Sequence, residues 1–217
     1  MATKFLIDGP AAAKYAVLLA HGAGGPMDSP AMTGAAKALT DSGFRVARFE
    51  FEYMANRRGS ATRKPPPRAE RLGPEYLAAI NTLRATEPLK GPLIIGGKSM
   101  GGRIASMIAD DLHAAGRIAG LLCLGYPFHP PGRPEQLRTA HLAKMKTPAL
   151  IVQGTRDPFG TRAEVATYTL SKAIEILWLE DGDHDLKPRK RVSGFSAADH
   201  LRSLGEAVAA WAGRIAA

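Results

Sequence analysis

The stretch Leu93–Arg103 reads Leu-Ile-Ile-Gly-Gly-Lys-Ser-Met-Gly-Gly-Arg and carries the strongest structural signal in the chain. A short apolar run ends in glycines and a helix-length segment follows, which predicts a buried strand, a tight turn and a helix. The turn contains G-x-S-x-G, with the serine at Ser99. This pattern is typical of a strained turn that raises a serine hydroxyl above a sheet, where side chains at the glycine positions would collide with neighbours. We therefore take Ser99 as the candidate nucleophile.

Two other interpretations of this turn were weighed. A phosphate-binding loop needs G-x-x-x-x-G-K-S, but position 92 holds Pro92 instead of glycine, so the spacing excludes it. A serine that only caps the following helix remains the plain structural alternative.

Outward from this turn, apolar runs alternate with amphipathic segments, which predicts parallel strands joined by right-handed helical crossovers. The expected strands are Tyr15–Ala20, Phe44–Phe51, Leu93–Ile95, Ile118–Leu124, Ala149–Val152 and Ile174–Leu179, with Phe5–Ile7 as a candidate edge strand. The expected helices are Ser29–Asp41, Pro74–Ala85, Met100–His113, Thr161–Leu170 and Ala197–Ile215. The pattern predicts one three-layer α/β domain over residues 1–217, with a mostly parallel sheet of about six or seven strands.

Length and composition agree with an ordinary globular domain. The chain has 217 residues, of which 45% are apolar and 23% charged, which excludes a collagen, a disordered tail or a disulfide scaffold. No run approaches the roughly 20 apolar residues of a membrane span, and the first residues lack the pattern of a signal peptide, so no membrane partner is expected. The single cysteine, Cys123, favours a reducing, cytoplasmic location.

A serine nucleophile needs a base and an orienting acid, and both are found after later strands. Asp157 follows the strand that ends near Val152, and His184 follows the strand that ends at Leu179. The order serine, acid, histidine along the chain is one of the known orders for a nucleophile, its orienting acid and its base. Parallel strands bring the loops at their carboxyl ends to the same edge of the sheet, so the three residues can meet there. Rival acids lie beside the histidine at Asp181, Asp183 and Asp185.

Negative charge on a reacting carbonyl oxygen requires fixed N–H donors. One candidate is the amide of Met100, directly after the nucleophile, and the second is Ala23 in the glycine-rich turn His21–Gly25, with Gly24 as the fallback. Candidate pocket residues are Gly24 and, after the fourth strand, Tyr126, Phe128 and His129.

Two long loops interrupt the alternation, at residues 56–73 and 126–147. The second loop is long for a simple connection but short for a lid, and prolines stiffen it. We therefore expect a minimal lid and a shallow, open site. The formal net charge is +9, and ten of the 29 basic residues lie in the loops 56–73 and 187–191. These loops either steer an anionic substrate or are simply solvated. Nucleic acid is disfavoured because aromatic residues do not alternate with the cations.

Six blocks of the chain together resemble a known family. They are His21–Gly25, Pro65–Arg68, Gly96–Arg103, Gly125–Gly132, Gln153–Gly160 and Gly182–Leu186. The chain looks like a small serine α/β-hydrolase of the dienelactone-hydrolase-like kind, within the bacterial predicted-hydrolase group that resembles testis-expressed protein 30 and the non-specific-lethal complex subunit 3. The resemblance implies the α/β-hydrolase fold, with Ser99 as nucleophile, Asp157 as acid and His184 as base. Dienelactone hydrolases proper use cysteine in place of the serine, so a lactone substrate does not carry over.

The function expected from these observations is hydrolysis of carboxylic esters or thioesters through an acyl-enzyme, without cofactor or metal. The substrate would be a small molecule, with an anionic acyl group as one candidate. A homo-oligomer and acyl transfer to an acceptor other than water stay open. The alternative is a hydrolase-like scaffold that binds a protein or nucleic-acid partner.

Overall fold

The computed structural model describes residues 3–58 and 65–215. The strands are Phe5–Asp8 (β1), Tyr15–Ala20 (β2), Phe44–Phe49 (β3), Leu93–Lys98 (β4), Gly120–Leu124 (β5), Ala149–Gly154 (β6) and Ile174–Leu179 (β7). The α-helices are Pro30–Asp41 (α1), Glu52–Arg57 (α2), Gly73–Thr86 (α3), Met100–Ala114 (α4), Arg162–Val165 (α5), Lys190–Ser193 (α6) and Ala197–Ile215 (α7). Two 3₁₀ turns lie at Ala69–Arg71 (η1) and Leu142–Lys144 (η2).

The seven strands form one sheet in the order β1-β3-β2-β4-β5-β6-β7. Only the edge strand β1 runs antiparallel to its neighbour β3, and the other pairs are parallel. The prediction of a mostly parallel sheet of six or seven strands is confirmed. Parallel pairing brings the carboxyl ends of β2, β4, β5, β6 and β7 to the same edge of the sheet.

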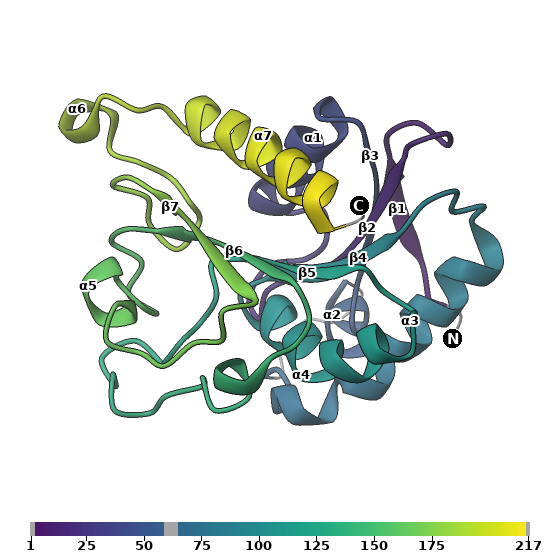
Figure 1. Ribbon diagram of the computed structural model, residues 1–217, viewed down its shortest axis with the longest axis horizontal. Helices are drawn as coiled ribbons and strands as arrows, with labels where there is room; N and C mark the ends of the chain where they lie inside the picture. The colour runs from purple at the N-terminus through teal and green to yellow at the C-terminus, as the bar shows by residue number, and fades with distance from the viewer. Residues whose placement is uncertain (1–2, 59–64, 216–217) are drawn as a thin grey trace.

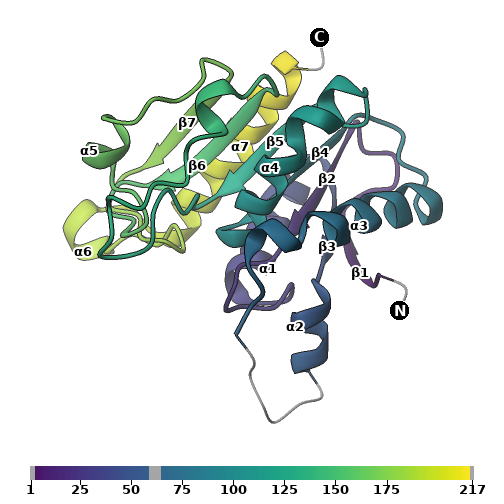
Figure 2. The same cartoon turned by 90° about the horizontal axis from the view of Figure 1, so that it is seen from below.

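Helices cover both faces of the sheet and bury two apolar layers. In Figure 1, α1 and α7 lie on one face, and α3 and α4 lie on the other. Seen from below, α3 and α4 run across the sheet as neighbours (Figure 2). The α1/α7 layer is filled by side chains such as Leu39 and Trp211, and the α3/α4 layer by side chains such as Tyr76 and Ile104. This is the predicted three-layer arrangement.

Several boundaries differ from the sequence prediction. The strand expected to reach Phe51 ends at Phe49, because the Phe51 N–H donates to His21 Nε2 at 3.2 Å and Phe51 becomes the N-cap of α2. The expected helix at 161–170 ends at Val165: a capping box between Thr161 and Glu164 starts it, but the chain then turns away. The loop expected at 56–73 contains η1 and the end of α2, and its basic residues at positions 63 and 64 lie outside the described ranges.

The connection between β5 and β6 is the place where a lid would be inserted. It spans residues 125–148 and holds only the single turn η2. Within residues 3–58 and 65–215, no helix is both long and apolar enough to cross a bilayer.

Candidate active site

Ser99 occupies a strained turn between β4 and α4. Its backbone has φ 50° and ψ −115°, a left-handed conformation that a side chain rarely adopts, and its N–H donates to the Leu124 carbonyl at 2.9 Å. A Cβ on Gly101 would lie 2.5 Å from the Ala20 carbonyl oxygen, and one on Gly97 would overlap the same oxygen. Glycine at both positions therefore lets the turn pack against β2 while the serine stays at the sheet edge.

The structure brings the serine together with the predicted base and acid. His184 Nε2 lies 2.9 Å from Ser99 Oγ, and His184 Nδ1 lies 2.8 Å from Asp157 Oδ2. The three residues come from the loops after β4, β6 and β7 and are 27 to 85 positions apart. A serine, an imidazole and a carboxylate in this chain of contacts can pass a proton from the hydroxyl to the imidazole.

Asp157 is fully buried and receives a hydrogen bond at each of its oxygens. The Phe159 N–H donates to Oδ1 at 2.9 Å, and the Gln153 amide donates to Oδ2 at 3.0 Å, beside the histidine. A buried carboxyl group is costly unless hydrogen-bond donors face it, and these two donors meet that need. The rival acids serve other contacts: Asp181 accepts from Arg189, and Asp183 from the backbone N–H groups of residues 185 and 187.

Gln153 and Phe159 were not predicted as site residues. Gln153 is fully buried at the end of β6, and its amide also donates to the carbonyls of Tyr126 and Gly160 and accepts the Tyr126 N–H at 2.7 Å. The Phe159 ring stacks on His184 with 4.1 Å between ring centroids and 29° between planes. The sequence signal for Gln153 was a polar side chain at the end of an apolar strand, four positions before the candidate acid.

The turn His21–Gly25 lies against the serine. A Cβ on Gly22 would stand 3.7 Å from the Ser99 Cβ. The Ala23 carbonyl accepts hydrogen bonds from the Tyr53 hydroxyl at 3.2 Å and from Arg57 at 3.4 Å, so α2 fixes this turn. Within the described ranges, the N–H groups of Ala23 and Met100 donate to no other protein group.

His21 supports this turn from beneath. Burial lowers its pKa, and its Nε2 accepts the Phe51 N–H, so the ring is neutral in this contact. Its neighbours Phe51 and Tyr53 pack around the ring.

Three of the four predicted pocket residues do not face solvent. Tyr126 and Phe128 are fully buried and pack on each other at 4.9 Å between centroids, with the Tyr126 hydroxyl donating to the Arg138 carbonyl. His129 is also buried and lies 3.6 Å from Glu164 of α5. These side chains stabilise the loop after β5, so the expectation that they line an open pocket is corrected. Gly24 alone of the four is exposed, with open space around it.

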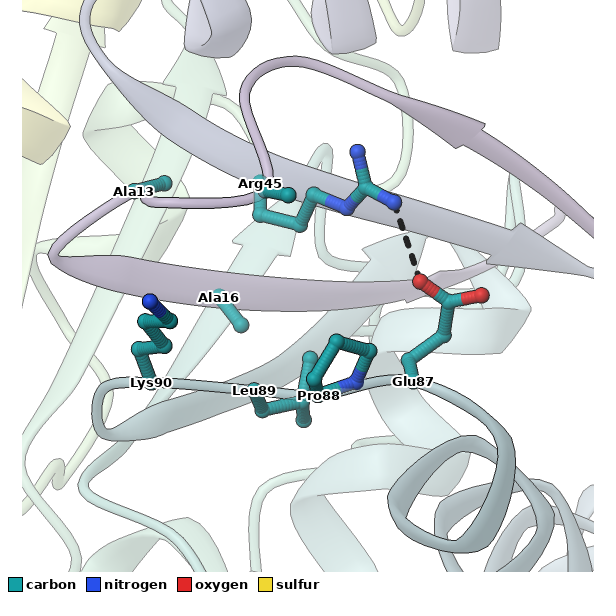
Figure 3. A pocket seen from close by; sticks show the side chains of 8 residues that line it. Ala13, Ala16, Arg45, Glu87, Pro88, Leu89 and Lys90 are labelled. Carbon is teal, nitrogen blue, oxygen red and sulfur yellow. Dashed lines mark hydrogen bonds and ion pairs between the residues drawn. The ribbon is translucent and has the colours of Figure 1, made fainter.

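Another serine–histidine contact and a small pocket lie away from Ser99. Ser106 Oγ is 2.8 Å from His141 Nε2, but the serine is buried and its hydroxyl donates to the Arg103 carbonyl. The pocket in Figure 3 measures about 10 Å³ and lies at the starts of the strands, where Arg45 and Glu87 form an ion pair at 2.9 Å. Neither place holds a nucleophile that a substrate could reach.

Comparison with known proteins gives one family and a set of structural neighbours. Residues 13–213 match the family described as "Alpha/beta hydrolase domain". The "Putative protein-lysine deacylase ABHD14B" of Pongo abelii is 28% identical over 152 residues, which is 70% of this chain and 66% of that protein. The chain thus matches just under two thirds of that relative's length.

Solved structures share the fold at low identity. Dienelactone hydrolase from Anabaena variabilis superposes with a TM-score of 0.72 at 19% identity, covering 98% of this chain and 91% of that one. XC6422 from Xanthomonas campestris, described as an α/β serine hydrolase without lid, gives 0.69 at 21% identity, covering 96% and 89%. With the sheet order, the helix layers and a family match over nearly the whole sequence, the chain belongs to the α/β hydrolase domain family.

Proposed function

We propose that this protein is a serine hydrolase that cleaves carboxylic esters or thioesters through an acyl-enzyme. The observation that carries this proposal is the continuous contact from Ser99 Oγ to His184 Nε2 at 2.9 Å and from His184 Nδ1 to Asp157 Oδ2 at 2.8 Å. An isolated serine hydroxyl is a poor nucleophile, and this arrangement supplies the base that activates it.

In the first half of the reaction, the Ser99 hydroxyl attacks the substrate carbonyl carbon while His184 Nε2 takes the hydroxyl proton. Asp157 holds the ring by its Nδ1–H and stabilises the imidazolium that forms. The tetrahedral oxyanion is held by the N–H groups of Met100 and Ala23, and this role is supported because neither group donates to another protein group within residues 3–58 and 65–215. Collapse breaks the bond to the alcohol or thiol, which leaves with the proton from His184. In the second half, His184 takes a proton from water as the water oxygen attacks the acyl-serine. Collapse of this second tetrahedral intermediate releases the carboxylic acid, and His184 returns the proton to Ser99 Oγ.

The short β5–β6 connection supports an accessible substrate site, since residues 125–148 hold only the single turn η2. A second candidate substrate class is the N-acyl group of lysine, favoured by the similarity to a putative protein-lysine deacylase. Amide cleavage uses the same acyl-enzyme, with the lysine amine as leaving group. We propose the 1–217 chain as a single catalytic domain without cofactor or metal.

The test is labelling with a fluorophosphonate probe. Wild type is expected to be labelled and Ser99→Ala to be unlabelled while remaining folded. Ser106→Ala is the matched control, because it removes the other serine that contacts a histidine and should keep full labelling. Labelling that survives in Ser99→Ala, or is absent from folded wild type, would contradict the proposal.

A panel of substrates then separates the classes. p-Nitrophenyl esters, an acyl-thioester and an acetyl-lysine peptide are compared by kcat/KM. The ester or thioester is expected to exceed the peptide, and the reverse order would favour the deacylase.

A further inference from the structure

Lys98 directly precedes the candidate nucleophile, yet its charged side chain is buried. Only 10% of the side chain is exposed, and its Nζ lies 3.5 Å from Asp185 Oδ1. Burial lowers the pKa of Lys98, and Asp185 and Asp157 act in the opposite direction. The 3.5 Å contact between Lys98 Nζ and Asp185 Oδ1 is the geometry of an ammonium–carboxylate ion pair.

The ammonium lies next to the catalytic histidine. Gly125, with φ 65°, separates them: a Cβ on this residue would lie 3.3 Å from both His184 Nδ1 and Lys98 Nζ. The same Cβ would lie 2.8 Å from the His184 carbonyl oxygen. Glycine at this position therefore lets the end of β5 approach both the lysine and the histidine loop.

Carboxylates and cations both lie around His184. Asp157 bonds the ring, and the loop itself carries Asp183 and Asp185 on either side of the histidine. The nearby cations other than Lys98 are Lys187, 4.0 Å from Asp185, and Arg156, 3.7 Å from Asp183.

Elements packed against this loop add little further charge. Lys98, Asp185 and Lys187 line a cavity of about 70 Å³ whose other walls are Leu186 and apolar residues of α1, β5 and α7. From α7, His200 Nδ1 contacts the Leu186 carbonyl at 2.8 Å. From the β6–α5 loop, the uncharged ring of Phe159 faces His184. Low exposure and apolar walls weaken solvent screening of the buried lysine.

We propose that Lys98 is a positioning residue, whose ammonium holds Asp185 and offsets the carboxylates around His184, so that the charge surrounding the imidazole depends on both Lys98 and Asp185. Three carboxylates favour the imidazolium, and a nearby cation disfavours it. This inference rests on the proposed function, because it concerns His184 as the general base.

The experiment follows the rate of fluorophosphonate labelling of Ser99 between pH 4 and pH 9. Lys98→Met is expected to move the acidic limb of the profile upward by about one pH unit, because the opposing cation is lost. Asp185→Asn is expected to move the limb downward, because a carboxylate is lost. The double variant should return near the wild-type position. A merely structural role would lower the rates without shifts of opposite sign.

Two controls sharpen the result. Lys98→Arg keeps the charge and should keep the wild-type limb. Lys187→Met removes the other lysine beside Asp185, but its side chain is 57% exposed, so solvent screening should leave the limb within about 0.3 pH unit of wild type. Circular dichroism reports folding, and Asp185→Asn, at a residue whose side chain is 48% exposed, keeps the test usable if Lys98→Met unfolds.

The outcomes separate the two proposals. The role of Lys98 would be overturned if both variants label normally at high pH and the acidic limb of the pH profile stays in place. It would also be overturned if the limb moves in the same direction in Lys98→Met and Asp185→Asn. Either result would leave the hydrolase proposal intact. Folded wild type that is unlabelled at every pH would overturn both.

Discussion

At the scale of single residues, the candidate site depends on how a buried carboxylate is satisfied. Asp157 is held by a histidine and a glutamine at Oδ2 and by a backbone amide at Oδ1. Gln153 is the most connected of these, since its side chain links Asp157 to the Tyr126 backbone and the Gly160 carbonyl. The orientation of His184 thus depends on a buried residue outside the candidate triad.

Replacing Gln153 with leucine tests this dependence. Gln153→Leu leaves the buried Tyr126 N–H without its acceptor and removes one donor from Asp157, so we expect a loss of about 1–3 kcal/mol in the free energy of unfolding. The labelling rate of Ser99 should fall at least about tenfold, because a looser carboxylate orients the imidazole poorly. Urea unfolding and labelling kinetics measure the two effects. The control Gln136→Leu, at an exposed position, should change neither, and unchanged labelling in folded Gln153→Leu would refute the positioning role.

The sequence predicted the residues that follow strand ends, but not the residues that touch them. Ser99, Asp157 and His184 could be found because each lies within five residues of the end of a strand, and parallel strands bring such positions together. Gln153 and Phe159 could not, since periodicity tells which face a side chain occupies and not which loop reaches it. Tyr126 and its neighbours were misplaced for the same reason: aromatic side chains after a strand can fold back into the core as easily as they line a pocket.

At the scale of elements, the loop that carries His184 is anchored by strained residues on both sides. Asp181 has φ 56° and Leu186 has φ 64°, both left-handed. Asp181 accepts hydrogen bonds from the backbone and side chain of Arg189, and the Leu186 carbonyl contacts His200 of α7. Long periodic elements were predictable, whereas α2, α6 and the 3₁₀ turns were not, because one or two turns carry no repeat of apolar residues.

The anchor at Asp181 should make stability depend on pH. The hydrogen bond from the Arg189 side chain, more than any other contact, lowers the pKa of Asp181 to about 2. A carboxyl whose pKa is lowered by folding stabilises the native state above its unfolded pKa of about 3.9 and loses this contribution as the pH falls toward 2.

Asp181→Asn keeps a residue that tolerates left-handed backbone but removes the charge. We expect a lower Tm than wild type at pH 7, and a difference that shrinks between pH 4 and pH 2 as the wild-type carboxyl is protonated. Thermal unfolding followed by circular dichroism measures it. A Tm difference that is constant from pH 7 to pH 2 would show that the charge of Asp181 contributes nothing.

At the scale of the whole molecule, the net charge of +9 is an excess of cations over carboxylates, and several of the cations are paired with carboxylates in place. Arg58 pairs with Asp28 and Glu50, and Arg189 pairs with Asp181. Lys190 and Arg191 are exposed on α6 and take part in none of the ion pairs found in the described part of the chain. Since α6 follows the His184 loop (Figure 1), we predict that its cations attract an anionic substrate.

Charge reversal at two ends of the molecule tests this attraction. Lys190→Glu/Arg191→Glu changes α6, and Lys90→Glu/Lys172→Glu makes the same change in net charge at exposed residues before β4 and β7, at the opposite edge of the sheet. At 20 mM salt, the α6 variant is expected to lower kcat/KM for an anionic p-nitrophenyl ester about three- to tenfold relative to a neutral ester, and the control variant should lower it less. At 0.5 M salt both differences should vanish, because screening then acts within a few ångströms. Equal losses in the two variants would mean that only the total charge matters, and no loss in either would mean that the basic loops are merely solvated.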